Sequence, residues 1–402
     1  HMNEISIPKE QKRRLLVTIL AGHGLKHMFN AAFFILLPGI KEGLSLTNSQ
    51  IGFMSSTRQF AGGIANIPAG YVGDKYPQKV ALILSLTIIV LGIFAFFLGI
   101  SNTFFIALIF SGLFSVVISF YHPAAIASLS RNFADRRGFA VSLHGTGGSI
   151  GETAAPILVG ALLKYTPLIW SSILQISIIP AIVFGILMYF LLKNIPQQQT
   201  SENLTFTKFV SGVGGLFKNK KLLIVLLIAA GFAGGQGTML TFLPIYMDEN
   251  LGFSPFRYGV YITLANVGGI ISQPIMGHLS DKYNRKLILA PSLTILGMSY
   301  ICLLTSNIVL FTIVIIIMGI FLFPMMAILV VSATDLVDSN IQGTTVALVF
   351  AAVTIFSSFI PSLAGILADT DIRYAFMLAS GVGVLAGLIA FLGNWTVSKT
   401  ID

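Results

Sequence analysis

The stretch Gly70-Tyr71-Val72-Gly73-Asp74-Lys75-Tyr76 returns 207 residues later as Gly277-His278-Leu279-Ser280-Asp281-Lys282-Tyr283. Each copy ends a long apolar segment, and both keep the first glycine and the final Asp-Lys-Tyr. Other glycines and prolines recur at offsets of 205 to 207 residues: Gly52 and Gly259, Gly62 and Gly269, Pro38 and Pro244, and Pro156 and Pro361. Prolines inside apolar segments are tolerated where neighbouring helices satisfy the backbone groups that they free. Their recurrence therefore indicates that the chain consists of two structural repeats.

The composition indicates that lipid surrounds most of the chain. Of 402 residues, 55% are hydrophobic and 10% are charged, and the mean hydropathy is +0.88. A soluble domain carries about 25% charged residues. A helix needs about 20 apolar residues to cross the hydrocarbon of a bilayer. The single cysteine, Cys302, excludes an internal disulfide framework.

The apolar segments predict an all-α membrane protein of twelve transmembrane helices in two six-helix, pseudo-symmetric bundles. The expected spans are 14–40, 47–73, 79–100, 103–131, 137–165, 168–192, 221–250, 255–281, 286–305, 307–336, 342–369 and 372–396. Residues 1–192 form the first predicted bundle, 193–220 a polar cytoplasmic linker and 221–402 the second bundle. Halves that start on the same side of the membrane are parallel repeats about an axis normal to it.

The distribution of lysine and arginine predicts the orientation. With both termini cytoplasmic, the inside segments hold 18 of the 24 basic residues, the outside loops hold four, and Lys26 and Arg58 lie within spans. Such a bias is the positive-inside signal of a prokaryotic inner-membrane protein. It also accounts for the net charge of +9 without a nucleic-acid partner, because short basic loops face anionic lipid.

Ionisable residues gather in the first half. His23, Lys26, His27 and Asn30 share one face of the first span, at spacings of three, four and seven. The others lie in spans two, four and five: Arg58, Tyr121, His122, His144 and Glu152. Charges inside a membrane are costly and usually functional.

The repeat-related positions of the second half are mostly apolar. Phe232 corresponds to Lys26 and Ala265 to Arg58, whereas Gln236 keeps the polarity of Asn30. The scaffold therefore does not require these charges, which favours a functional role. The facing half contributes neutral polar groups, of which Gln236 and Asn266 are included in the predicted site.

The sign of these charges predicts an anionic substrate. Lys26 and Arg58 outweigh Glu152, and arginine can hold a carboxylate, phosphonate or phosphate in bidentate fashion. The predicted substrate-binding residues are His23, Lys26, His27, Asn30, Arg58, Tyr121, His122, Gln236 and Asn266. Glu152 is the predicted proton carrier, with His144 or His122 as a relay, because a buried carboxylate without a partner favours its neutral form.

Structural interpretations of the same residues stay open. Lys26 could pair with Glu152 to tie spans one and five together, and Arg58 could stabilise a contact of span two with span four or eleven. Each histidine could serve helix packing. His23 and His27 have the spacing of metal ligands, but Lys26 between them would repel a cation, so no metal is expected.

The two copies of the opening stretch resemble the loop signature of the major facilitator superfamily, found between spans two and three and again between spans eight and nine. The resemblance extends over the whole chain and implies a transporter. It also implies that Gly70, Asp74, Lys75, Gly277, Asp281 and Arg285 form a conformational latch between the halves in the outward-open state.

A more limited resemblance is to the fosmidomycin-resistance-like branch and neighbouring anion or drug transporters. It rests on Tyr121-His122-Pro123-Ala124-Ala125 and on the pattern Gly147-Gly148-x-x-Gly151-x-x-x-x-Pro156. The drug-antiporter signature has proline directly after its second glycine, where this chain has Glu152.

The sequence thus predicts a monomeric secondary active transporter that moves a small organic anion by alternating access with proton coupling. The first alternative is a multidrug/H+ antiporter that exports amphipathic compounds, and the second a metal or metal-chelate transporter. The chain contains no GxxxxGK[ST] or HExxH pattern, so neither ATP use nor an enzyme is predicted, and no cofactor is expected.

Overall fold

The computed structural model describes residues 8–133, 136–196, 207, 218–336 and 342–396, and their regular structure is helical. The N-terminal helices are α1 (Lys9–Gly43), α2 (Asn48–Lys75), α3 (Val80–Gly99), α4 (Phe104–Ile118), α5 (Tyr121–Asn132), α6 (Arg137–Tyr165), α7 (Trp170–Ile176) and α8 (Ile178–Leu192), with a short 3-10 helix, η1 (Pro77–Lys79), before α3. The C-terminal helices are α10 (Lys220–Glu249), α11 (Pro255–Lys282), α12 (Arg285–Cys302), α13 (Ile308–Thr334), α14 (Gln342–Ser357), α15 (Phe359–Ala368) and α16 (Arg373–Leu392). The predicted linker lies largely outside the described residues.

All twelve expected spans are present, but three of them consist of two helices each. The breaks fall at Phe120 between α4 and α5, at Ser177 between α7 and α8, and at Ser358 between α14 and α15. Each break lies three residues before a proline: Pro123, Pro180 or Pro361. Proline has no backbone N–H and its ring crowds the carbonyl four residues earlier, so the helix is interrupted there.

Side-chain caps fix where several spans begin. At the start of α2, the side chain of Thr47 accepts a hydrogen bond from the backbone N–H of Gln50, and the backbone N–H of Thr47 donates to the side chain of Gln50. Ser254 caps α11, the repeat-related helix, in the same way through the N–H of Arg257. Such caps satisfy backbone donors that the first turn leaves free.

Seven helical segments among the described residues are long and apolar enough to cross a membrane by length and composition. The helices that fall below that threshold are α1, α2, α6, α11 and α12. Of these, α1, α2 and α6 carry buried or half-buried ionisable side chains. Their lower hydropathy is therefore the signature of the polar interior described below.

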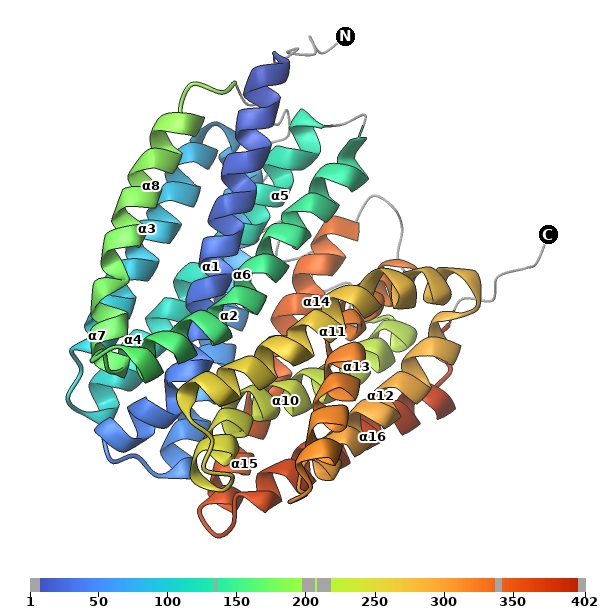
Figure 1. Cartoon of the computed structure of the whole chain (residues 1–402). Coiled ribbons are helices and arrows are strands. Elements are labelled where there is room, and N and C mark those ends of the chain that lie inside the picture. Colours follow the sequence, from blue (N-terminus) through green and yellow to red (C-terminus); the bar gives the residue numbers. More distant parts are fainter. Residues whose placement is uncertain (1–7, 134–135, 197–206, 208–217, 337–341, 397–402) are drawn as a thin grey trace.

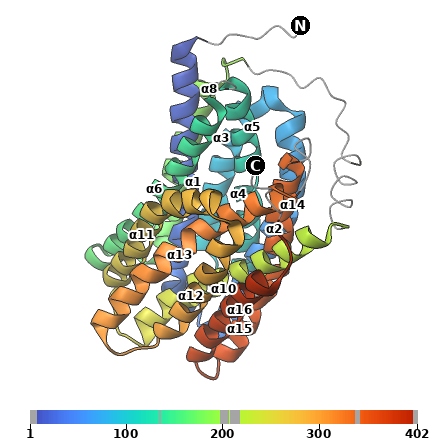
Figure 2. The same ribbon diagram turned by 90° about the vertical axis from the view of Figure 1, so that its right-hand side faces the viewer.

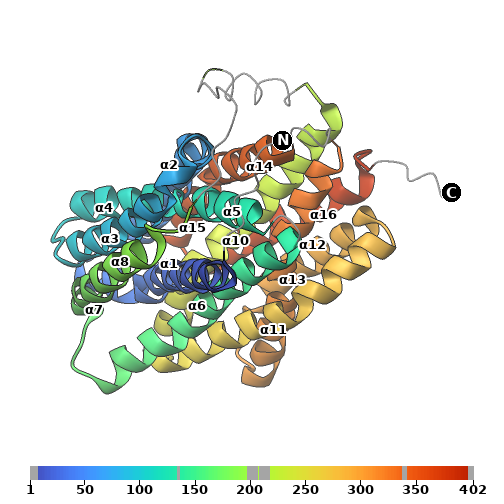
Figure 3. The ribbon, with the colours of Figure 1, turned by 90° about the horizontal axis from the view of Figure 1, so that it is seen from above.

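The helices form two bundles that meet along two seams (Figures 1 and 3). In one seam α2 packs against α14 and α15, and in the other α6 packs against α11. Because α2 and α11 are repeat-related, as are α6 and the α14–α15 pair, the two seams are equivalent in the pseudo-symmetry.

Close approach of backbones defines both seams. A Cβ added to Gly52 would lie 2.3 Å from the carbonyl oxygen of Pro361, and one added to Gly259 would lie 2.3 Å from that of Pro156. These are the glycines and prolines that recur in the sequence. The repeat thus encodes two matching helix contacts, each of which has room only for glycine.

One ion pair and several hydrogen bonds join the halves at one end of the bundles. Lys41 binds both carboxylate oxygens of Glu249, at 2.7 and 2.8 Å, and Asp369 accepts hydrogen bonds from Ser49. Asn48 donates to the carbonyl of Ala368 at 2.9 Å. From this end the two bundles diverge toward the end that carries the N-terminus (Figures 1 and 2).

We expect Gly52→Ala to open the closed end, because the added methyl group must displace the backbone of α15. An overpacked contact costs about 1 to 3 kcal/mol, enough to shift the equilibrium between conformations several-fold or more. The distance distribution between spin labels at positions 42 and 250, measured by electron double resonance, should move to longer values.

Gly381→Ala is the matched control, since a Cβ at Gly381 meets no atom within 4 Å. It should leave the distribution unchanged. Equal distributions in Gly52→Ala and the unmodified protein would contradict the role of this seam in closure.

Candidate functional site

The site is built where α1 packs closely against α6. A Cβ added to Gly151 would lie 1.9 Å from the carbonyl oxygen of Gly24, and one added to Gly147 would lie 2.6 Å from that of Leu20. This contact sets the ionisable face of α1 directly beside α6. A Cβ on Gly148 would likewise touch the rings of His23 and His27, at 2.6 and 2.9 Å.

Four histidines and Lys26 form one cluster on α1, α5 and α6. The Nζ of Lys26 lies 2.7 Å from Nε2 of His122 and 3.4 Å from Nε2 of His27. The Nδ1 of His23 lies 2.6 Å from the carbonyl oxygen of His144, and the rings of these two residues stack with centroids 3.7 Å apart. His23, Lys26 and His144 are each at most 3% exposed.

Glu152 lies at the edge of this cluster and faces the other half. Its carboxylate is 3.6 Å from Nδ1 of His27, and the two side chains are 32% and 20% exposed. The hypothesis of a direct Lys26–Glu152 pair is wrong for this conformation, because His27 takes the place beside Glu152. Lys26 is held by neutral imidazoles instead.

The backbone at Glu152 joins the two halves. Pro156 cannot donate to the carbonyl of Glu152, and the side chain of Asn266 on α11 donates to it at 2.8 Å. Thr263 donates to the next carbonyl, that of Thr153, at 3.0 Å. Asn266 therefore acts through the backbone of α6, in addition to its position at the edge of the predicted site.

The repeat-related residues also meet on the other seam, but through their side chains. Gln59 corresponds to Asn266, and Ser357 corresponds to Glu152. Ser357 donates to Oε1 of Gln59 at 3.0 Å. These residues were missed as a cross-half contact, although the repeat relates them to Asn266 and Glu152.

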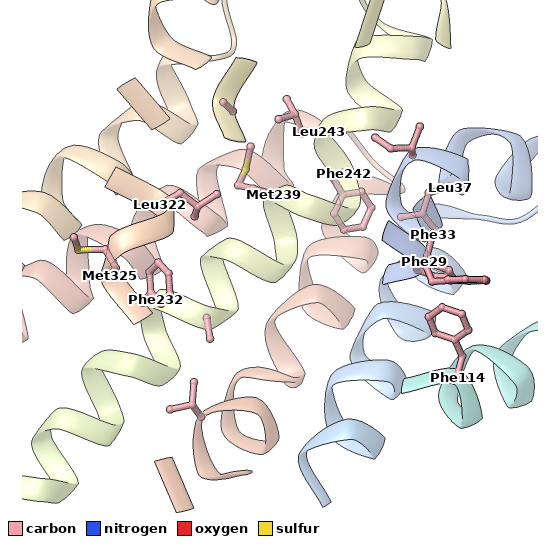
Figure 4. Packing of buried hydrophobic residues seen from close by; sticks show 14 of the residues in the cluster. Phe29, Phe33, Leu37, Phe114, Phe232, Met239, Phe242, Leu243, Leu322 and Met325 are labelled. Atoms are coloured by element: carbon pink, nitrogen blue, oxygen red, sulfur yellow. The ribbon is translucent and has the colours of Figure 1, made fainter. Parts of the chain in front are cut away.

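Arg58 occupies a separate pocket in the N-terminal half. It donates to Oδ1 of Asn30 at 2.9 Å and to the carbonyl of Ser111 at 3.5 Å. Its guanidinium lies 3.7 Å from the ring centre of Phe33 and 4.9 Å from that of Phe114. Figure 4 shows these two rings in the N-terminal half, close to Phe29. The contact with Ser111 on α4 matches the expected span-two to span-four interaction.

Two other predicted residues have modest roles here. Tyr121 is fully buried, and its hydroxyl donates to the carbonyl of Ile19 at 2.8 Å, which ties α5 to α1. Gln236 is half-buried on α10, beside Gly237, which packs against Gln59.

The signature loops make contacts inside each half. Arg285 binds Asp281 and also Asp335, at 3.0 Å, so it joins the ends of α11, α12 and α13. Lys75 donates to the hydroxyl of Tyr71. Asp74 and Gly70 lie near the end of α2, and a Cβ on Gly277 would meet no atom within 4 Å. The proposed latch between halves stays a prediction.

Two repeat-related bundles of membrane-spanning helices, closed at one end and carrying polar groups near mid-span, define a secondary transporter. The chain belongs to the Major Facilitator Superfamily, whose sequence profile matches residues 19–259 and 232–399. The fold is confirmed by a bacterial homologue of the human lysosomal transporter Spinster in its inward-facing, unoccupied conformation. The TM-score is 0.80 at 16% identity, over 96% of this chain and 97% of that one.

Curated bacterial relatives agree with this assignment. An uncharacterised transporter of the superfamily, YfnC of Bacillus subtilis, is 26% identical over 93% of this chain and 92% of its own. The probable nitrate transporter NarT of Staphylococcus epidermidis is 26% identical over 69% of each chain. The fosmidomycin resistance protein of Escherichia coli is 26% identical over 37% of this chain and 36% of its own, which supports the second resemblance. The chain is thus a multi-pass membrane transporter that handles small molecules.

Proposed function

We propose that this protein moves a small anion across the membrane by alternating access, coupled to protons. One observation carries the proposal: Lys26 and Arg58 are 3% and 4% exposed, and within the described residues neither has a carboxylate within 4.0 Å. Their hydrogen-bond partners are neutral, and the charge of Glu152 reaches Lys26 only from beyond ion-pair distance.

Buried cations without a counter-charge are costly, because hydrogen bonds from neutral groups replace only part of the lost hydration. An anion that reached Lys26 from the space between the halves would supply the missing charge. His27 and Glu152 are partly exposed and would offer the route. The positive charge of Arg58 would attract the anion from a distance. Arg58 would bind the anion directly if its hydrogen bond to Asn30 breaks.

The relatives support an anion without naming it. NarT is described as a probable nitrate transporter, and nitrate is an anion. The alternative, export of amphipathic drugs, has support from Multidrug resistance protein 2 of Bacillus subtilis, which is 23% identical over 88% of both chains. Drug export requires no pair of uncompensated cations.

Binding of anions to the purified protein tests this function. Thermal-shift screening against an organic-anion library should reveal compounds that stabilise the folded protein. Lys26→Ala should weaken their binding about 10- to 100-fold, since a hydrogen bond to a charged group contributes about 1.5 to 3 kcal/mol.

Lys79→Ala is the control, because Lys79 is an exposed residue of η1. It should leave affinity unchanged. If lipophilic cations stabilise the protein, and Lys26→Ala does not lower the affinity for any ligand, drug export replaces anion transport as the proposed function.

The orientation is part of the proposal: both termini and the linker between the proposed domains, 1–192 and 221–402, are cytoplasmic. The closed end would then be periplasmic and the structure inward-facing. A cysteine at position 199, with Cys302→Ser, should resist a membrane-impermeant maleimide in intact cells and react in inside-out vesicles. Labelling in intact cells would reverse the topology.

Glu152 is the proposed proton-coupling carboxylate. An anion that neutralises the charge of Lys26 leaves less positive charge near Glu152, which then binds a proton more readily. Anion and proton would reinforce each other's binding by linkage, which suits symport. Glu152→Gln in proteoliposomes should retain substrate exchange but lose accumulation driven by a pH gradient.

Thr153→Ala, one residue away, should retain both activities. Undiminished gradient-driven accumulation in Glu152→Gln would assign Glu152 a structural role.

A further inference from the structure

Three imidazoles from three helices converge inside the N-terminal half. His23 on α1, His122 on α5 and His144 on α6 each place a ring nitrogen within 4.8 Å of the other two. We propose that these residues form a binding site for a divalent transition-metal ion, with Zn²⁺ as the best-fitting occupant. The site goes beyond anion transport and does not depend on it.

Hydrogen bonding leaves lone pairs available for an ion. A carbonyl oxygen only accepts, so Nδ1 of His23 must carry the proton that it shares with the carbonyl of His144. Neutral His23 then has its lone pair on Nε2, and this buried atom has no hydrogen-bond partner among the described residues. A backbone carbonyl on the far nitrogen is the arrangement that orients metal-binding histidines.

His144 supplies the second unused group. It is 2% exposed, and neither of its ring nitrogens has a hydrogen-bond partner in the described part of the chain. A buried polar group without a partner costs free energy that a bound ion would recover. Stacking on His23, at 3.7 Å between centroids, holds the two rings together.

The third ligand, His122, is already engaged by Lys26. An ammonium only donates, so Nε2 of His122 accepts at 2.7 Å and its lone pair is occupied. The ammonium group of Lys26 therefore occupies the lone pair of His122 that a metal ion would bind. Metal binding requires this side chain to swing away, and the two cations exclude each other.

The donor set selects the class of ion. Three neutral imidazoles suit Zn²⁺, Cu²⁺, Ni²⁺ or Co²⁺, whereas Mg²⁺ and Ca²⁺ require oxygen ligands. Nitrogens bound tetrahedrally at about 2.0 to 2.1 Å from Zn²⁺ lie about 3.3 Å apart, so rings whose nitrogens are up to 4.8 Å apart must close by up to about 1.5 Å. The fourth position would stay open to water or an anionic group.

Direct metal binding by full-length protein in detergent tests the site. After chelator treatment, Zn²⁺ is titrated calorimetrically, and Co²⁺ is followed by the visible bands of tetrahedral coordination, in protein lacking His1. Lys26→Met should bind one Zn²⁺ at least about tenfold more tightly than the unmodified protein, because it removes the competing charge. Lys26→Met with His144→Ala should lose more than about 100-fold of that affinity, beyond the effect of an outer-shell change.

Two further variants separate loss of a ligand from loss of folding. Lys26→Met with His144→Cys should recover binding, since thiolate also binds Zn²⁺. Lys26→Met with His278→Ala, which changes a histidine of the other half, should match Lys26→Met. The proposal is overturned if Lys26→Met binds Zn²⁺ no more tightly than the unmodified protein, or if adding His144→Ala leaves its affinity unchanged. Neither result bears on anion affinity.

Discussion

A helix in hydrocarbon must satisfy its backbone carbonyls from within the protein, and proline leaves one of them without a helical partner. This constraint connects the repeat, the seams and the site. Pro156 frees the carbonyl of Glu152, and Asn266 from the opposite half binds it. The residue proposed to carry protons therefore lies at a point where the two halves are hydrogen-bonded. The carbonyl that Asn266 binds and the carboxylate proposed to bind protons belong to the same residue. A change in the contact between the halves would therefore act directly on Glu152.

The two seams share their backbone geometry but differ in side-chain chemistry. Where α6 has Glu152, the repeat-related position has Ser357, whose hydroxyl bonds with Gln59. The contact of Ser357 with Gln59 is thus neutral, whereas the other seam carries the carboxylate of Glu152 beside His27. The ionisable residues of the proposed site belong to the N-terminal half, and the C-terminal half presents neutral groups to them.

The sequence predicted the fold closely because its determinants are local. Hydrophobic length sets the spans, and the recurring glycines and prolines mark the seams. The breaks before Pro123, Pro180 and Pro361 agree with proline chemistry, but Pro156 and Pro244 lie inside unbroken helices, so proline positions alone did not place the breaks. The face of α1 was correctly grouped, since spacing alone decides which residues share a helix face.

The partners of those residues could not be read from spacing, because they depend on how neighbouring helices rotate and approach. The sequence suggested Glu152 for Lys26, yet the glycine contact of α1 with α6 places His27 beside the carboxylate. The ring pocket of Arg58 depends on α4. The grouping of His23 with His122 and His144 needs three helices at once.

The pair of Lys41 and Glu249 at the closed end has a consequence for ionic strength. Its side chains are 14% and 43% exposed, so dissolved ions on that side screen their attraction. The Debye length falls from about 8 Å at physiological salt to about 3 Å at 1 M. The buried seams at Gly52 and Gly259 are not weakened in this way. Salt on that side of the membrane would therefore loosen the rim of the closed end while its centre stays packed.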